Sequence, residues 1–274
     1  MRPFDILPDE DYRLKMRFEQ RPVADFYRPG AAHREVIAER RRWLSIHPEI
    51  HTALEPEGVP LLAETIRMAA RLNTLPASSA IEDLDNASPS EMCRWLGERW
   101  EPDFLLLKPD AQGTFRLRGG GLCFPSHWDL SEKMGRTMAE IHGPVPDLNA
   151  QLGRQIDGFL RRMKPGISWQ RLNWGLSRTP ELNLHPARNL PALDPTVGLD
   201  DVWWRIEDQS LVALPESGGI LFGIRLVLKS YRDVRADPAL RQGMIRALRT
   251  MPEPMAAYKG LTSSRQRLID LLAD

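Results

Sequence analysis

The chain has 274 residues, enough for one large domain or two modest ones with a core that needs no disulfide. Its 37 basic residues balance 37 acidic ones, so no global field attracts nucleic acid or an anionic membrane. The two cysteines, Cys93 and Cys123, form no CxxC pair, which argues against a zinc or iron–sulfur site. A signal-peptide core and a bilayer-spanning apolar run are both absent from the sequence. We therefore expect a cytoplasmic protein without a nucleic-acid or membrane partner.

The first hundred residues predict an extended arm followed by helices. Residues 1–30 are rich in proline and charge and show no period, as expected of an arm. Residues 31–100 are mainly helical by pattern, with helices expected over 31–46 and 59–72 and another beginning at Ser88. That last start is a capping box, in which Glu91 follows the Ser88 N-cap and Pro89 takes the first helical position. The basic run 40–42 predicts a solvated helix face.

Residues 101–235 predict a sheet-rich core. Strand patterns cover the ranges 103–108, 115–123, 167–176, 202–214 and 219–231. Residues 215–218 have the composition of a hairpin turn between the last two strands. Two helices are expected inside this core, one from a capping box at Asp129 to Gly143 and one over 148–163.

Residues 236–274 predict a helical tail that begins at Asp237 and ends with an amphipathic helix up to Ala273. The order of helices, antiparallel strands and helices is typical of the α+β class. No loop has the composition of a flexible linker, so we expect one domain over residues 1–274.

The segment 119–146 holds the residues best suited to chemistry. Its three glycines at 119–121 lack the lysine and hydroxyl of a phosphate-binding loop, and they indicate either close approach of a ligand or a bulge. His127 is either a capping or surface residue or a ligand. His142 ends a predicted helix, where it either favours the helix dipole or ligates a metal held by the rigid turn that follows. His185, in a loop, is a further candidate.

One predicted strand carries an unusual polar face. Arg205, Glu207 and Gln209 alternate along it, so they point the same way. They are either exposed to solvent or part of a buried hydrogen-bonded network. The sequence shows no order of Ser, His and Asp and no HExxH motif, so neither a hydrolase nor a zinc protease is supported.

An ordered set of motifs resembles the haem-dependent oxidative N-demethylase family. The patterns are F-P-S-x-W-D-L-x-E-K-x-G from Phe124, I-H-x-P-V-P from Ile141, R-x-N-W from Arg171, R-I-E-x-Q-x-L-x-x-L-P from Arg205, L-F-x-I-R from Leu221 and Y-K-G from Tyr258. Each pattern alone is weak, but their order is specific, and together they span roughly residues 90–260. The first ninety residues match poorly.

The resemblance implies a PAS-like antiparallel sheet flanked by helices, with a helical N-terminal part. It implies haem b as the cofactor, and a monooxygenase subunit that removes an N-methyl group from a small secondary amine with O2. The electrons would come from a partner reductase that carries FMN, a 2Fe-2S cluster and NAD(P)H. Two alternatives remain at this point: a non-catalytic PAS-like haem sensor, and a haem-free ligand-binding protein.

The resemblance also suggests roles for particular residues. His142 lies in the most distinctive turn and is the expected axial ligand of the haem iron, with His127 and His185 as alternatives. The expected catalytic residues are Glu207, which would hold a cationic amine, and Tyr258, which would donate a hydrogen bond to oxygen or substrate. Further cofactor contacts are expected from Arg205 and Arg225, as partners of the propionates, and from Trp128 and Asn173.

Overall fold

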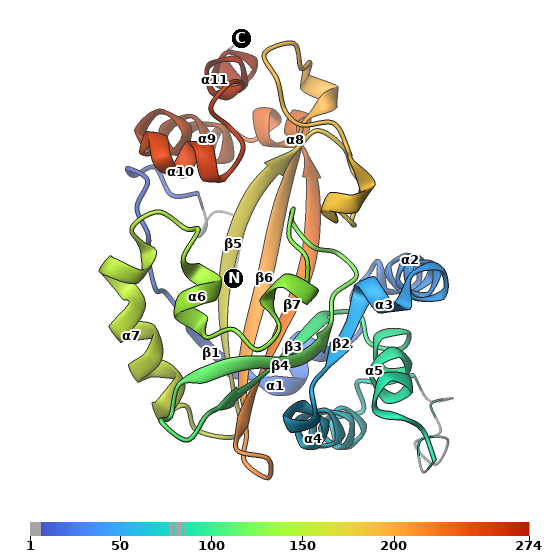
Figure 1. Cartoon of the computed structure of the whole chain (residues 1–274). Helices are drawn as coiled ribbons and strands as arrows, with labels where there is room; N and C mark the ends of the chain where they lie inside the picture. Colours follow the sequence, from blue (N-terminus) through green and yellow to red (C-terminus); the bar gives the residue numbers. More distant parts are fainter. Residues whose placement is uncertain (1–6, 77–78, 80–83, 85, 274) are drawn as a thin grey trace.

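The computed structural model describes residues 7–273 except 77–78, 80–83 and 85. One seven-stranded antiparallel sheet runs through the molecule in the strand order β1-β5-β6-β7-β3-β4-β2. Figure 1 shows the long strands β5, β6 and β7 in the centre, with helices around them. The predicted α+β class, an antiparallel sheet flanked by helices with a helical N-terminal part, is confirmed. Within the described ranges, no helix has the length and apolar character needed to cross a bilayer.

The strands are short at the edges of the sheet and long in its middle. They are β1 (Glu19–Pro22), β2 (Thr52–Leu54), β3 (Asp103–Pro109), β4 (Phe115–Gly121), β5 (Ile167–Ser177), β6 (Trp203–Leu214) and β7 (Gly219–Ser230). The predicted hairpin turn joins β6 to β7, and the buried Glu64 carboxylate holds it by accepting the backbone N–H groups of Glu216 (3.1 Å) and Ser217 (2.7 Å).

The α-helices fall into three groups along the chain. The N-terminal group is α1 (Val23–Tyr27), α2 (His33–Ile46), α3 (Pro48–His51), α4 (Val59–Arg71) and α5 (Pro89–Gly97). The central pair is α6 (Met138–His142) and α7 (Leu148–Arg162). The C-terminal group is α8 (Tyr231–Ala236), α9 (Pro238–Thr250), α10 (Glu253–Tyr258) and α11 (Arg265–Ala273). Between them lie the 3-10 turns η2 (Pro56–Gly58), η4 (Ser131–Lys133), η5 (Pro186–Arg188) and η6 (Leu199–Asp201).

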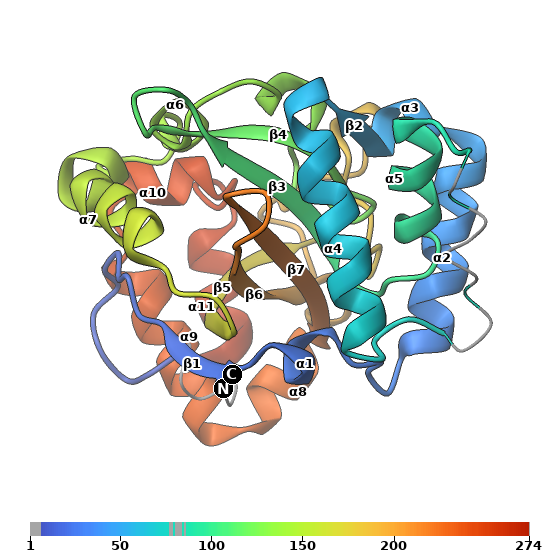
Figure 2. The ribbon, with the colours of Figure 1, turned by 90° about the horizontal axis from the view of Figure 1, so that it is seen from below.

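Different helices pack against the two faces of the sheet, because successive side chains of each strand point to opposite faces. Leu105 and Phe222 are paired in the ladder and pack with apolar residues of α6 and α7. Leu106 and Leu221, one residue further along, point the other way and pack against α4 and α5. Figure 2 shows α7 and α4 on opposite sides of the sheet. Helices α8, α9 and α11 form a separate apolar cluster around Trp204, where β6 begins and β5 and β7 end.

The predicted helix from Asp129 to Gly143 is wrong. The Asp129 carboxylate accepts the backbone N–H of Ser131 at 2.7 Å, but only the short turn η4 follows it. The chain then pairs with β4, because Gly135 N–H donates to the Leu117 carbonyl at 2.9 Å with Gly135 at φ +70°. A second capping box at Thr137 starts α6, which is therefore only five residues long. Pairing with β4 overrides the local helix signal.

The glycine triplet serves strand packing, and the β3–β4 ladder is irregular between Leu106 and Leu107, as the bulge alternative predicts. A β-carbon on Gly119 would lie 2.4 Å from Leu54 Cδ1, and one on Gly120 would lie 2.3 Å from the Phe104 carbonyl oxygen. Glycine at these positions lets β2 and β3 approach β4 on both sides.

The basic run 40–42 is only partly a solvated face. Arg41 and Arg42 are exposed, but Arg40 is fully buried. Its guanidinium donates to Asp103 Oδ1 at 2.5 Å and to the Gly97 carbonyl at 2.7 Å. Asp103 also accepts the backbone N–H groups of Cys123 (2.7 Å) and Phe124 (3.0 Å). This buried ion pair therefore anchors the segment that follows β4.

Candidate functional site

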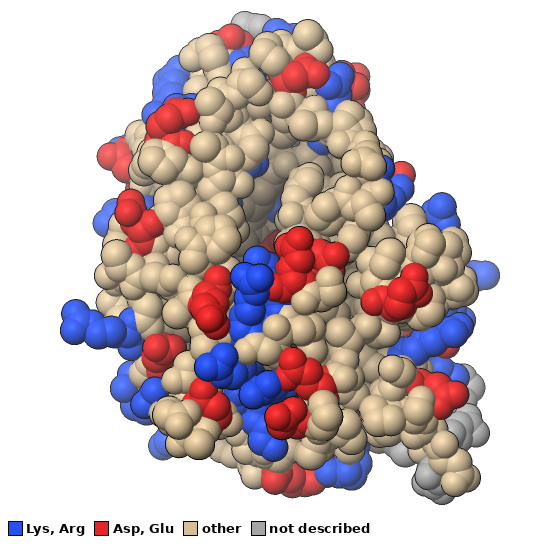
Figure 3. Space-filling model, in the orientation of Figure 1, with Lys and Arg blue, Asp and Glu red and all other residues tan. Residues whose placement is uncertain are grey.

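A cavity of about 360 Å³ lies between α6–α7 and the face of the sheet that they cover. Its volume falls within the roughly 300–1,000 Å³ of small-molecule sites. Apolar side chains form most of its walls, among them Leu107, Leu148, Leu152, Ile156, Leu211 and Phe222. Figure 3 shows the surface hollowed in front of this face of the sheet, with charged side chains of both signs gathered along the lower edge of the hollow.

The N-terminal arm, residues 7–18, closes the cavity along the β5 edge of the sheet. At one end Arg246 of α9 holds the arm through Asp9 (3.3 Å) and Asp11 (3.0 Å). At the other end Phe18 stacks on Phe159 of α7, with ring centroids 4.6 Å apart. The arm therefore ties the C-terminal helices to α7 across the cavity.

His142 ends α6 and lines this cavity. Among the described residues, no side-chain hydrogen bond or ion pair engages its imidazole. Burial lowers the pKa of His142, and the nearby Arg171 guanidinium lowers it further, although Asp157 raises it. The imidazole is thus neutral at pH 7, with ring nitrogens available to a ligand in the cavity.

The polar floor of the cavity is the network that the alternation on β6 suggested. Glu207 Oε1 accepts the Ser126 hydroxyl at 2.8 Å, and Oε2 accepts the side-chain amides of Asn173 (3.1 Å) and Gln209 (3.0 Å). Asn173 and Gln209 line the cavity. The register explains the cluster, because Asn173 pairs with Glu207 across β5 and β6, while the loop after β4 brings in Ser126.

Three further residues of the cavity wall carry polar groups. Tyr258, at the end of α10, is half exposed, and burial together with Glu207 raises the pKa of its hydroxyl. Lys259 follows it, and its ammonium donates to the Trp174 carbonyl at 2.6 Å. Arg171 lies on β5, two residues before Asn173 and on the same face. The motifs R-x-N-W and Y-K-G contain Arg171 and Lys259, yet pattern alone assigned neither of them a role.

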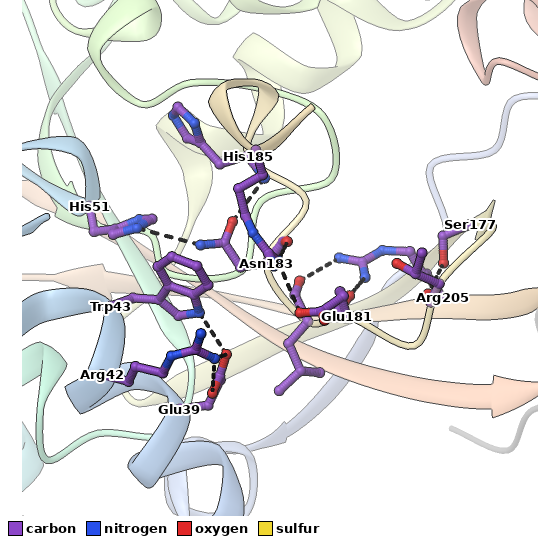
Figure 4. A network of polar contacts seen from close by, with 12 residues as sticks. Glu39, Arg42, Trp43, His51, Ser177, Glu181, Asn183, His185 and Arg205 are labelled. Atoms are coloured by element: carbon purple, nitrogen blue, oxygen red, sulfur yellow. Dashed lines mark hydrogen bonds and ion pairs between the residues drawn. The ribbon is translucent and has the colours of Figure 1, made fainter. Parts of the chain in front are cut away.

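Arg205 and Arg225 lie outside the cavity lining. Arg205 is buried, and its guanidinium donates to the carbonyls of Glu181 (2.7 Å) and Leu182 (3.0 Å), as Figure 4 shows. Burial lowers the pKa of Arg205 to about 10. Arg225 pairs in the ladder with Asp208, so it points to the opposite face from Glu207. There it contacts Glu101 at 3.2 Å and the carbonyls of α1 and its C-cap.

The other histidine candidates also lie outside the cavity lining. His127 is exposed, with φ +64°, next to the bridge between Ser126 and Leu184. His185 is buried in a separate cluster, where its ring lies edge-on to His51 at 6.0 Å (Figure 4) and its Nε2 is 3.4 Å from Asp129 Oδ2. Trp128 packs with the apolar residues beneath α6 and α7.

We expect the free energy of unfolding to fall as the pH drops below about 6.5. Desolvation lowers the pKa of His51, His142 and also His127 from the 6.5 of an unfolded chain, so the unfolded state takes up protons first. Urea unfolding at pH 7.5, 6.5 and 5.5 measures this slope. Replacing these histidines by glutamine should flatten it, and an unchanged slope would assign the effect to other groups.

The fold and the site together define a class. A neutral histidine, a hydrogen-bonded carboxylate and half-buried cations around an apolar cavity are typical of a domain that binds a small ligand or cofactor. Over residues 72–269 the sequence matches the model of the family described as haem-dependent oxidative N-demethylase, alpha subunit-like. This match covers more than half of the chain, and the protein belongs to that family. The arm at residues 7–18 lies outside the matched range.

Proposed function

We propose that this chain is the haem-binding subunit of an oxygenase that removes the methyl group from a small secondary amine. The observation that carries the proposal is His142, a neutral imidazole without a protein partner among the described residues, set in the wall of an apolar cavity. A haem iron takes a neutral imidazole as its axial ligand.

The residues present fit haem b. Its flat apolar macrocycle suits walls of leucine, isoleucine and phenylalanine. Its two carboxylates need cations nearby, and Arg171 on β5 and Lys259 after α10 are cations of the cavity wall. When bound, the haem would supply O2 reduction and transfer of one oxygen atom to the methyl carbon. The overall balance is RNH–CH3 + O2 + 2e⁻ + 2H⁺ → RNH2 + HCHO + H2O.

In this proposal Glu207 holds the substrate. A secondary amine is a cation at neutral pH, and a carboxylate fixed by Ser126, Asn173 and Gln209 attracts it without having to reorganise. Tyr258 keeps its proton, because its pKa is raised, and can donate a hydrogen bond into the cavity. Arg205 supports the network from behind, with a guanidinium nitrogen 3.5 Å from Ser126 Oγ.

The electrons would come from another chain. The sequence contains no nucleotide-binding glycine motif and no cysteine cluster for iron–sulfur ligation. We propose a reductase partner with FMN, a 2Fe-2S cluster and NAD(P)H, and a cytoplasmic location for the pair.

Glu207→Gln should lower kcat/KM for dimethylamine by about 10²-fold while the Soret band stays. The glutamine keeps the size of the side chain but removes the charge that attracts the amine. The assay is NAD(P)H-driven formaldehyde release from the haem-loaded protein with a flavin and iron–sulfur reductase.

Glu132→Gln, an exposed carboxylate in η4, is the matched control and should keep full activity. A wild-type protein that binds haem but releases no formaldehyde across a panel of methylamines would contradict the oxygenase and favour a haem sensor. A wild-type protein that binds no haem would contradict both.

A further inference from the structure

We propose that Arg171 and Lys259 form a carboxylate-binding site in the cavity wall, beside Glu207. The inference rests on the proposed function, because it concerns what that cavity holds. It assigns the anionic groups of the occupant to two residues other than Arg205 and Arg225.

Arg171 is the first half of the site. Its side chain shares the cavity-facing side of β5 with Asn173, and its guanidinium lies 6.0 Å from the centroid of the Phe18 ring on the arm. Across the described part of the chain, no hydrogen bond or ion pair reaches this guanidinium. Desolvation lowers the pKa of this half-buried cation, although the Glu207 charge opposes that effect. A charge of this kind gains from a direct partner, and the cavity that Arg171 lines has room for one.

Lys259 is the second half. Its ammonium lies 5.2 Å from the Trp174 ring and makes its one hydrogen bond, among the described residues, with a neutral carbonyl. Burial lowers the pKa of Lys259 to about 8, Arg171 lowers it further and Glu207 raises it. The two cations therefore lie near enough to interact with each other, and an ammonium has three donors, so two remain for a ligand.

Glu207 compensates only part of the charge of this pair, because one carboxylate favours the charged form of two cations. Its oxygens accept hydrogen bonds from Ser126, Asn173 and Gln209, and within the described contacts it makes no ion pair with either cation. The pair would also repel a cationic amine held at Glu207. An occupant that brings carboxylates removes this repulsion and completes the charge balance of the cavity.

The donor set favours a carboxylate over a phosphate. Phosphate sites commonly use free backbone N–H groups, but those of β5 face its neighbours β1 and β6 in the ladder. A planar guanidinium with an ammonium beside it suits a carboxylate, which Arg binds in a bidentate manner. Two sources have this chemistry: the propionates of haem, and the carboxylate of an N-methyl amino acid whose ammonium meets Glu207.

The first experiment compares haem with its dimethyl ester, which lacks the charges, by Soret titration of the full chain. We expect the wild type to prefer haem by about ten- to a hundredfold, and Arg171→Gln or Lys259→Gln to lose about tenfold for haem but little for the ester. Arg249→Gln removes an exposed cation of α9 that does not line the cavity and serves as the matched control with unchanged affinity.

The second experiment distinguishes the substrate as the source. Binding of N-methylglycine and of dimethylamine is measured by calorimetry on wild type and on Arg171→Gln. One outcome would assign the carboxylate to the substrate and keep the site. In that outcome haem and its ester bind equally well, the affinity for N-methylglycine falls about tenfold in Arg171→Gln, and the affinity for dimethylamine does not change. This assay also tests the site if the wild type takes up no haem, which would overturn the proposed function alone.

The melting temperature of the apo protein tests whether Arg171 and Lys259 have a purely structural role. Removing a half-buried cation that has no hydrogen bond among the described residues should leave the Tm of Arg171→Gln at or above that of the wild type. Lys259→Gln also loses the hydrogen bond to the Trp174 carbonyl, so its Tm should fall slightly. A fall in Tm together with equal loss for haem and ester would overturn the inference. So would affinities for haem, ester and N-methylglycine that both variants leave unchanged, while His142-dependent haem binding persists.

Discussion

His142→Ala is expected to weaken haem binding at least 100-fold and to remove the Soret band of the purified protein. The variant deletes the cavity-lining imidazole that we expect to bind the iron, and alanine offers no donor atom in its place. The change should cost little stability, because no hydrogen bond of the imidazole is lost within the described residues. Titration of the apo protein with haem measures the affinity.

His127→Ala is the matched control, since it removes an exposed imidazole that does not line the cavity. It should bind haem as the wild type does. Adding free imidazole to His142→Ala should restore part of the Soret band, because the small ligand can enter the space left behind. Full haem affinity in His142→Ala, with loss in His185→Ala, would move the axial ligand to the cluster around His51.

Asp103→Ala is expected to lower the free energy of unfolding by about 3–5 kcal/mol. The change leaves the Arg40 guanidinium buried without its counter-ion, and it strands the backbone N–H groups of Cys123 and Phe124. Urea unfolding at pH 7 measures the loss. Because the Asp103 carboxylate anchors the segment that carries Ser126, the variant should also weaken the hydrogen bond from the Ser126 hydroxyl to Glu207.

Asp200→Ala provides the comparison for that prediction. It removes an Arg–Asp ion pair with more contacts, in which Arg232 reaches both oxygens of Asp200 at 2.7 Å, but both side chains are largely exposed. Exposed pairs contribute about 0–1 kcal/mol, so its loss should be small. Equal losses in the two variants would show that burial does not set the value of the Arg40–Asp103 pair.

Much of the fold follows from local pattern. The capping box at Ser88, the Asp237 N-cap and the alternation over β5, β6 and β7 act within a few residues, so their elements are found where the sequence predicts them. The helix expected from Asp129 fails for a non-local reason, because the chain there pairs with β4. The short strands β1 and β2 exist only through their partners, and no periodicity marks them.

In the candidate site too, some residues could be predicted from the sequence motifs and others only from the tertiary structure. The ordered motifs pointed to His142, Asn173, Glu207 and Tyr258, and three of these line the cavity, while Glu207 is bound to Asn173 beneath it. The motifs could not separate Arg171 from Arg205 and Arg225 as partners for an anion. That choice depends on which guanidiniums find carbonyls and carboxylates of their own.

The sequence by itself determined the class of the fold, the haem-dependent oxidative N-demethylase family and the residue types of the site, because these depend on local periodicity and on ordered motifs. Only the tertiary structure decided which charges are satisfied, which face of the sheet each side chain takes and that the arm at residues 7–18 closes the cavity. Those outcomes follow from contacts between residues far apart in the chain, and no short pattern records them.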